Sequence, residues 1–210
     1  VLARSEPSPA WPVTSADDAI TGNPFVRYRA LMYPWQVARA RGLSDEAYVA
    51  LVGELDRAVA TVDGHGFAIT PYRRSEAATW LHDRLWVKDE TGQVGRSHKA
   101  RHLFGVALWL AVAERTGLVT AADRARPLAI ASCGNAALAA AVIARAIERR
   151  LRVFVPAGAD PGVLARLTAL GAELTICARG DGEPPGDPSY HRFRAAVAGG
   201  AVPFTCQGPD

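Results

Sequence analysis

Cysteine is scarce in this sequence, and its placement excludes two classes of protein. The three cysteines, Cys133, Cys177 and Cys206, are spread over the second half of a 210-residue chain. An odd and widely spaced set is not the framework of a disulfide-stapled secreted domain, and it lacks the CxxC pairs of a zinc site. Such a set fits a reducing compartment, so we expect a cytoplasmic protein.

Long apolar runs are also missing. A membrane-spanning helix needs about 20 apolar residues in succession. The most apolar stretches, near residues 103–113 and 128–147, are too short or are interrupted by polar side chains. The N-terminal stretch VLARSEPSPAWPVTSADDA has no basic start followed by an apolar core, so we expect it not to be a signal peptide. We therefore expect no membrane partner.

The sequence has no strong excess of charge of either sign. Twenty-four basic residues stand against 21 acidic ones, a net charge of +3, and both signs are scattered along the chain. A nucleic-acid-binding domain concentrates its basic residues on one face. The densest basic stretch, GRSHKARHLFG at residues 95–105, is short and turns at once into an apolar helical pattern, so we expect no nucleic-acid partner.

The second half of the chain alternates regularly between short apolar strands and helices. The strand predictions fall on residues 128–132, 152–157, 172–177 and 201–206, and helical patterns separate them. Strands that are buried on both faces and joined by helices predict a parallel sheet with right-handed crossovers. The predicted fold class is therefore α/β, a parallel sheet with helices on both faces.

The first part of the chain follows a different pattern. Residues 1–24 are rich in Pro, Ser and Ala and predict an irregular lead-in. Ser44 is a suitable cap for a helix in which apolar residues recur at steps of three and four up to about residue 60. We therefore expect a mainly helical N-terminal extension over residues 1–66.

An α/β region is expected over residues 67–210. It begins with a strand predicted at 84–90 and a helix predicted from Ser97 to about Thr116. Its last residues follow a strand, at a point where another strand–helix unit is expected. The region is therefore expected to be incomplete at its C-terminus.

Three loops follow predicted strands, at residues 89–99, 132–136 and 156–161, and ligands of parallel sheets bind at the carboxyl ends of strands. Loop 132–136, SCGNA, offers a hydroxyl, a glycine, an amide and the N–H groups of a helix start, which suit a carboxylate or a phosphate. The alternative is a tight turn capped by Ser or Asn. Loop 156–161 predicts an ordinary turn capped by Asp160.

Lys99 has two possible roles. The pattern places it one turn inside a helix, where the helix dipole disfavours a positive charge. In the first role it is one of three solvated basic residues, with Arg96 and Arg101, at a helix start. In the second it is an amine at the mouth of a site, where partial desolvation favours the neutral form that reacts with carbonyl groups.

Three segments, taken in order, resemble the fold-type II pyridoxal-phosphate enzymes. They are KDE followed by SHKAR within residues 88–101, SCGNA at 132–136, and VFVPAGADPGVLARLTALGAEL at 153–174. That superfamily includes the tryptophan synthase beta subunit, threonine synthase, cysteine synthase, threonine dehydratase and diaminopropionate ammonia-lyase. The resemblance covers about residues 67–210. It implies the small-domain region of that fold, pyridoxal 5′-phosphate as cofactor and a small amino acid as substrate.

The resemblance also implies roles for individual residues. Lys99 matches the lysine that forms the internal aldimine and then moves the α-proton. Ser97 matches the serine two positions before that lysine, and Asn135 matches the asparagine that hydrogen-bonds the 3′ oxygen of the cofactor. The loop that binds the substrate carboxylate is matched by Ser132, Cys133, Gly134, Asn135 and Ala136. The implied reaction is a β-elimination or β-replacement by a lyase or synthase.

The sequence departs from the family pattern in three places. Arg96 stands where the family usually has a small residue, most often glycine, and His98 replaces a common phenylalanine. The glycine-rich phosphate cradle has no counterpart here, since no GGGxG occurs. The chain is therefore expected to act as a homodimer or with a complementing C-terminal half. The alternative is a non-catalytic fragment, a split subunit or an anion-binding α/β domain.

No metal site is expected. His98 and His102 lie four residues apart on a predicted helix, a spacing that suits two ligands of one ion. A third ligand is not placed near them in the sequence, and the other histidines are scattered.

Overall fold

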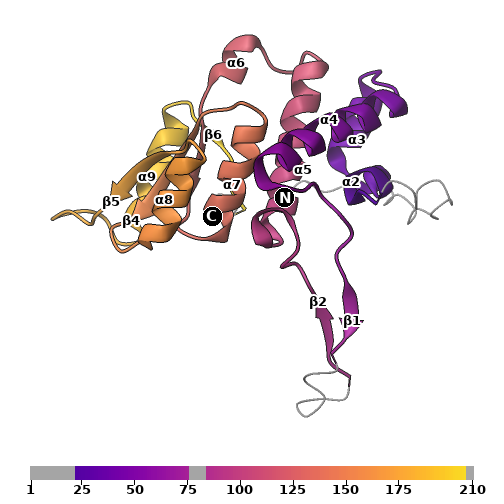
Figure 1. Cartoon of the computed structure of the whole chain (residues 1–210). Coiled ribbons are helices and arrows are strands. Elements are labelled where there is room, and N and C mark those ends of the chain that lie inside the picture. The colour runs from indigo at the N-terminus through magenta and orange to yellow at the C-terminus, as the bar shows by residue number, and fades with distance from the viewer. Residues whose placement is uncertain (1–21, 76–83, 207–210) are drawn as a thin grey trace.

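The computed structural model describes residues 22–75 and 84–206 of the chain. A four-stranded parallel sheet with helices on both faces forms one side of the molecule, and helices of the N-terminal part form the other (Figure 1). Most of the predicted lead-in, and the chain end after Cys206, lie outside the described residues.

The parallel sheet confirms the predicted fold class. Its strand order is β5-β4-β3-β6, and every neighbouring pair runs parallel. The strands are β3 (Leu128–Ala131), β4 (Leu151–Pro156), β5 (Glu173–Cys177) and β6 (Val202–Pro203). The first three lie close to their predicted ranges. β6 is much shorter than the predicted 201–206, and beyond it Phe204 gives one more backbone hydrogen bond to Ala129.

Alternate residues of β3 and β4 enter two separate apolar clusters, which is why both faces of the sheet are covered. Ala129 and Phe154 pack with Phe193 of α9 (Pro188–Ala198) on one face. Their neighbours in sequence, such as Ile130 and Val153, belong to the main core on the other face. There α7 (Asn135–Ala146) covers β3 and β4, and α8 (Pro161–Ala169) packs beside it on β5.

The helical character of the N-terminal part is confirmed within the described residues. Its elements are α2 (Pro24–Arg27), η1 (Arg29–Leu31), α3 (Tyr33–Ala40) and α4 (Asp45–Asp63). As predicted, Ser44 caps α4, because its hydroxyl accepts the N–H of Ala47 at 3.1 Å. Gly64, with φ of +92°, ends the helix in the left-handed conformation that favours glycine.

An aromatic cluster joins these helices to the rest of the chain. The ring centroids of Phe25, Phe67 and Phe104 lie 4.5–5.1 Å from one another. Phe104 belongs to α5 (Lys99–Arg115), which packs in turn against α7. One apolar core therefore runs from α2 to the sheet. The division of the chain at residue 66 stays a prediction.

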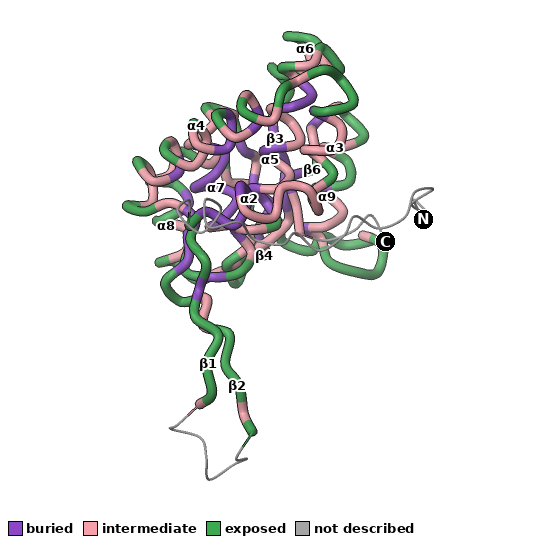
Figure 2. The backbone as a smooth tube through the Cα atoms, turned by 90° about the vertical axis from the view of Figure 1, so that its right-hand side faces the viewer, coloured by how far each residue is buried: buried purple, intermediate pink, exposed green. Residues whose placement is uncertain are grey.

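The strand predicted at 84–90 is confirmed over a shorter range. It forms β2 (Trp86–Lys88), which pairs antiparallel with β1 (Tyr72–Arg74) in a hairpin instead of joining the parallel sheet. The hairpin projects from the body, and most of its residues are exposed (Figures 1 and 2). The sequence pattern could not distinguish the two sheets, because short apolar runs look alike in both.

One short helix was not expected from the sequence. It is α6 (Ala121–Ala125), which follows α5. Thr120 and Asp123 cap its first turn reciprocally, each side chain binding the backbone N–H of the other residue. The Thr-x-x-Asp spacing was therefore the sequence signal for this helix.

The helix predicted from Ser97 begins two residues later, at Lys99. The backbone before it is not helical: φ is +64° at Gly95 and +54° at Arg96, and Ser97 is extended. Lys99 is therefore the first residue of α5, not a residue one turn inside it. The left-handed backbone at position 96 also explains why a glycine suits that position better than Arg96.

Replacing Arg96 with glycine is expected to stabilise the protein. An L-residue in the left-handed region costs ~1–2 kcal/mol, and the entropy cost of glycine, ~0.5–1 kcal/mol, offsets part of the gain, so the net gain is up to about 1.5 kcal/mol. Denaturant unfolding would measure it. Arg96→Ala, which removes the guanidinium but keeps the strain, should give no such gain. Equal stability of the two variants would contradict this explanation.

Asp45 connects α4 to the helices before it. It accepts hydrogen bonds from Arg29 Nε at 2.8 Å, from Arg29 Nη2 at 2.9 Å and from Trp35 Nε1 at 2.7 Å. The hydrogen bond from Arg29, together with that from Trp35, outweighs the effect of burial and holds the pKa of Asp45 below its usual value. The ionised form of Asp45 therefore stabilises the fold.

A pH dependence of stability follows from the lowered pKa of Asp45. Its contribution is complete above the unfolded-state pKa of about 3.9 and is lost as the pH falls through the lower folded-state pKa. Asp45→Asn should cost about 1 kcal/mol at neutral pH and flatten the fall in melting temperature below pH ~4. Glu54→Gln, which removes an exposed ion pair on the same helix, is the control. An unchanged acid slope in Asp45→Asn would contradict the assignment.

Candidate functional site

The turn that carries Lys99 lies at the carboxyl edge of the sheet. Cys206, which follows β6, has its Sγ 3.8 Å from the backbone oxygen of Lys99. β6 neighbours β3, and β3 leads into the loop that begins with Ser132. Because the carboxyl ends of parallel strands share one edge, Lys99 and the loop after β3 belong to the same end of the sheet.

The same turn also packs against α7. A Cβ placed on Gly95 would lie 3.5 Å from Cα of Ala139, in the second turn of that helix. The first residue of α7 is Asn135. The structure thus brings the Lys99 turn against the first two turns of the helix that begins with Asn135.

Lys99 is half-buried at the start of α5. Within residues 22–75 and 84–206, its Nζ makes no hydrogen bond or ion pair. Ser97 is buried, and its hydroxyl accepts the backbone N–H of Lys99 at 3.4 Å. His98 precedes the helix and is exposed, without capping it through its side chain. The amine of Lys99 is therefore available for a ligand.

The loop after β3 is not the capped turn that was the alternative prediction. Gly134 takes the position before α7, and no side chain caps the helix. Ser132 accepts only the N–H of Gly134, at 3.4 Å, and Asn135 is exposed as the first helical residue. The first N–H groups of α7 are therefore left for another acceptor, such as an anion. Cys133 is exposed beside them, and Ala136 is half-buried.

Loop 156–161 is the ordinary turn that the sequence predicted. Asp160 caps α8, since its carboxylate accepts the N–H of Val163 at 3.0 Å, and Pro161 fills the first helical position. The N-terminal N–H group that Asp160 binds is not left for a ligand.

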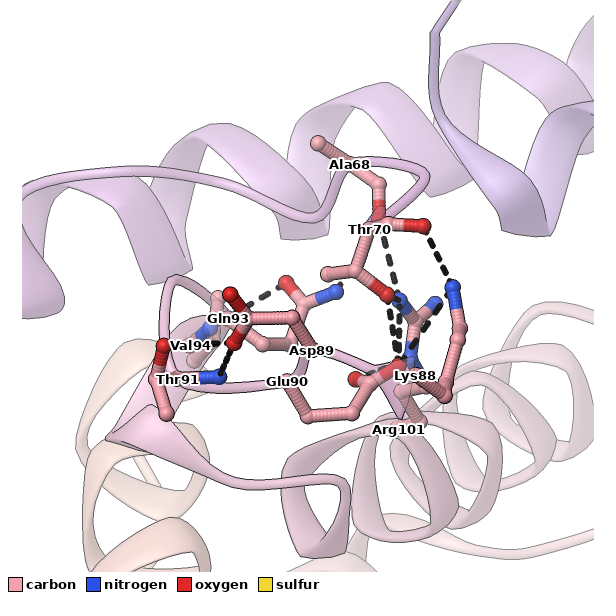
Figure 3. A network of polar contacts seen from close by, with 9 residues as sticks. All are labelled: Ala68, Thr70, Lys88, Asp89, Glu90, Thr91, Gln93, Val94 and Arg101. Atoms are coloured by element: carbon pink, nitrogen blue, oxygen red, sulfur yellow. Dashed lines mark hydrogen bonds and ion pairs between the residues drawn. The ribbon is translucent and has the colours of Figure 1, made fainter. Parts of the chain in front are cut away.

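Sequence reasoning missed the part played by Arg101. One of the two alternatives for the helix start left Arg101 solvated with Arg96, but it forms an ion pair with Glu90. Arg101 Nε donates to Glu90 Oε2 at 2.9 Å, and Thr70 donates to Glu90 Oε1 at 2.5 Å (Figure 3). The sequence signal for this ion pair was only that Glu90 and Arg101 carry opposite charges 11 residues apart. Such a spacing does not predict which charged residues will pair.

The charge of Glu90 is stabilised by this network. Burial by itself raises the pKa of Glu90, but the hydrogen bonds from Arg101 and Thr70, with the charge of Arg101, outweigh it and lower the pKa. Glu90 is therefore an anion at neutral pH and acts as the acceptor of the network.

A cleft of about 550 Å³ lies between α4, α5 and the end of α7, away from the predicted site residues. The charged groups at its rim are paired with one another, Arg149 and Arg124 with Glu114 and Arg115 with Glu54. It contains neither Lys99 nor the loop after β3. The candidate site is therefore the carboxyl edge of the sheet, not this cleft.

Two further classes of site were sought in the part of the chain that the structure describes. No group of three or more His, Cys, Asp and Glu side chains is arranged to hold a metal ion there. None of the described helices combines the length and the apolar character that crossing a bilayer requires.

Comparison with solved structures gives the same fold for the described part of the chain. Maize serine racemase matches with a TM-score of 0.52 and 15% identity, over 75% of this chain and 44% of that one. A pyridoxal 5′-phosphate-dependent aspartate racemase matches with a TM-score of 0.51 and 21% identity, over 72% and 44%. O-ureido-L-serine synthase matches with a TM-score of 0.51 and 20% identity, over 70% and 42%. The chain thus spans less than half the length of each of these structures.

Sequence comparison gives a family match but no match to a single curated protein. No curated protein sequence matches the chain. The family described as "Pyridoxal-phosphate dependent enzyme" matches residues 65–200, which include Lys99 and the loop after β3. The chain therefore belongs to the pyridoxal-phosphate-dependent enzymes and has the fold of their fold-type II members.

Proposed function

We propose that this chain forms the lysine-bearing part of a lyase or synthase that acts on a small amino acid. One observation carries the proposal. The amine of Lys99 and the amino end of α7, neither of which has a side-chain partner among the described residues, lie at the same edge of the sheet. A carbonyl compound and a carboxylate are the groups that these two features suit.

The described residues fit the cofactor in part. Lys99 would hold pyridoxal phosphate covalently through its amine, with Ser97 and Asn135 beside it. When bound, the cofactor supplies the electron sink for a carbanion at the α-carbon of the substrate. The glycine-rich phosphate cradle of the family has no counterpart in the sequence, so the phosphate group needs donors from elsewhere.

The residues of the loop after β3 would orient the substrate. The N–H groups at the start of α7 and the hydroxyl of Ser132 are donors for the substrate carboxylate. A carboxylate held there keeps the α-carbon in one orientation towards Lys99, whose amine then accepts the α-proton. Loss of a substituent from the β-carbon completes an elimination, and addition of a nucleophile completes a replacement.

Racemisation is the second candidate reaction. Two of the structural neighbours are racemases, of serine and of aspartate, and a third is a synthase. All three reaction types begin with removal of the α-proton. A racemase returns a proton to the α-carbon, whereas an elimination releases a keto acid after loss of the amine. Product analysis with small amino acids separates these possibilities.

Attachment of the cofactor to Lys99 is the first test, and the small number of lysines in the sequence makes its result easy to assign. Lys88 and Lys99 are the only lysines among the 210 residues. Incubation with pyridoxal phosphate, reduction with borohydride and peptide mapping should place the adduct on Lys99, because Lys88 already donates to the Thr70 carbonyl at 2.5 Å. Lys99→Arg should lose at least ~90% of the adduct, since arginine stays protonated, whereas Lys88→Arg should keep it.

The same experiment decides between the catalytic and the non-catalytic alternatives. A wild-type adduct on Lys88 or on the terminal amine, with none on Lys99, would contradict the proposed role of Lys99. The chain would then be the anion-binding or non-catalytic alternative. An adduct on Lys99 without turnover of any small amino acid would indicate a split subunit that needs a complementing C-terminal half.

The exposed hairpin supports an association of this chain with a partner. Tyr72 and Trp86 stack with their ring centroids 5.2 Å apart, yet they are 65% and 52% exposed. An isolated two-stranded hairpin is marginally stable in water, and exposed aromatic residues on it favour burial against another surface. A second copy of the chain and a complementing C-terminal half are the two partners that we propose.

Self-association through the hairpin is measurable by sedimentation. We expect a concentration-dependent dimer for the wild type and a dissociation constant at least ~10-fold higher for Trp86→Ser, because the aromatic contact area is lost. Tyr33→Ser is a matched control, since Tyr33 is 60% exposed and also packs on a tryptophan, Trp109, outside the hairpin. A wild type that stays monomeric at all concentrations would exclude the homodimer and leave the complementing half.

A further inference from the structure

Side chains from both ends of the turn that carries Lys99 donate hydrogen bonds to one backbone carbonyl. The oxygen of Ala68, in the stem of the hairpin, accepts a hydrogen bond from Gln93 Nε2 at 3.0 Å and another from Arg101 Nη2 at 3.1 Å (Figure 3). Gln93 stands at the beginning of the turn, and Arg101 lies in the first turn of α5. Both ends of the segment that contains Lys99 are therefore tied to the same point.

Glu90 and Thr70 hold Arg101 in this position. Arg101 donates to Glu90 Oε2 at 2.9 Å and to the hydroxyl of Thr70 at 3.0 Å. The side chains of Glu90 and Arg101 are 16% and 25% exposed, and Thr70 is 7% exposed. The pair is thus better shielded from water than an ordinary surface ion pair, which contributes little.

This closure acts on Lys99 beside two contacts of its own backbone: its N–H is accepted by the Ser97 hydroxyl at 3.4 Å, and its oxygen lies 3.8 Å from Cys206 Sγ. Its side chain has no partner among the described residues, and α5 begins with it without a side-chain cap from His98. Before it, the N–H of Gly95 is held by Asp63 at 3.1 Å. The buried residues Ala100 and Leu103 pack the start of α5 into the core, and the hydrogen bonds of Arg101 to Glu90 add a polar restraint on the same turn, two residues from Lys99.

We propose that Arg101 and Glu90 are positioning residues for Lys99. They fix the segment from Gln93 to Arg101 against the hairpin stem, so that the amine keeps one place at the edge of the sheet. Their importance for catalysis rests on the function proposed above. Their effect on the order of the turn is a property of the chain without cofactor and is open to separate measurement.

The test compares Arg101→Met with two other variants. Arg101→Lys keeps the charge but loses the planar fork that reaches three acceptors. Arg115→Met removes an arginine from the far end of the same helix, where its ion pair with Glu54 is exposed, and serves as the matched control. Circular dichroism and thermal unfolding establish that each variant is folded.

Two measurements without cofactor report on the turn. Amide hydrogen exchange of the peptide that covers residues 93–98 should be about 10-fold faster in Arg101→Met, as for a loss of ~1.4 kcal/mol from the opening free energy. Acylation of Lys99 by acetic anhydride, relative to the terminal amine, should rise severalfold. Arg101→Lys should fall between the wild type and Arg101→Met, and Arg115→Met should match the wild type.

A third measurement separates positioning from general stability. Trapping of pyridoxal phosphate on Lys99 by borohydride should fall in Arg101→Met while the cofactor-free acylation of the same amine rises. If the effect were a general loss of stability, the trapping and acylation of Lys99 would change in Arg115→Met as they do in Arg101→Met. Glu90→Gln should reproduce the pattern of Arg101→Met, which keeps the test valid if one variant fails to fold.

The outcomes distinguish this inference from the proposed function. Unchanged exchange and unchanged acylation in both Arg101→Met and Glu90→Gln would overturn the positioning role, whatever the cofactor does. A wild type that fails to trap pyridoxal phosphate on Lys99, but whose turn loosens in these variants, would overturn the proposed function and leave the positioning role standing.

Discussion

The ion pair between Glu90 and Arg101 connects the first turn of α5 to the segment that precedes it and helps to close the turn that carries Lys99. The backbone from Gly95 to Ser97 leaves the helical region, so the chain there lacks the repeating hydrogen bonds of a helix. Side chains replace them: Gln93 and Arg101 bind the same carbonyl, and Asp63 binds the N–H of Gly95. The conformation of the Lys99 turn is therefore fixed by contacts with segments that are distant in the sequence.

The parallel sheet provides the second condition for the site. Its strands all run in one direction, so the loop after β3 and the residues after β6 emerge at one edge. α7 starts at that edge without a side-chain cap, and the Lys99 turn packs on its second turn. A rigid apolar core beneath both elements holds the amine and the uncapped helix end in a constant relation.

Sequence signals such as helix caps and strand patterns predicted correctly the structure that depends on neighbouring residues. Ser44 and Asp160 cap the helices that they were expected to cap, because capping needs only a side chain and the N–H groups that follow it. β3, β4 and β5 were found for a similar reason, since short runs of β-branched and apolar residues identify strands of a parallel sheet. The helix before residue 116 was found, but its first residue was misplaced, because Arg96 adopts a backbone conformation that its residue type rarely takes.

The sequence by itself determined the order of the elements, the α/β class and the motifs by which the family is recognisable. Those properties depend on residue types at short spacing. Tertiary structure alone decided that 84–90 forms a hairpin outside the parallel sheet, and that Arg101 binds Glu90 instead of water. The physical reason is that partners in an antiparallel pair or an ion pair are selected by the packing of the whole chain, which places distant residues within a few ångströms of one another.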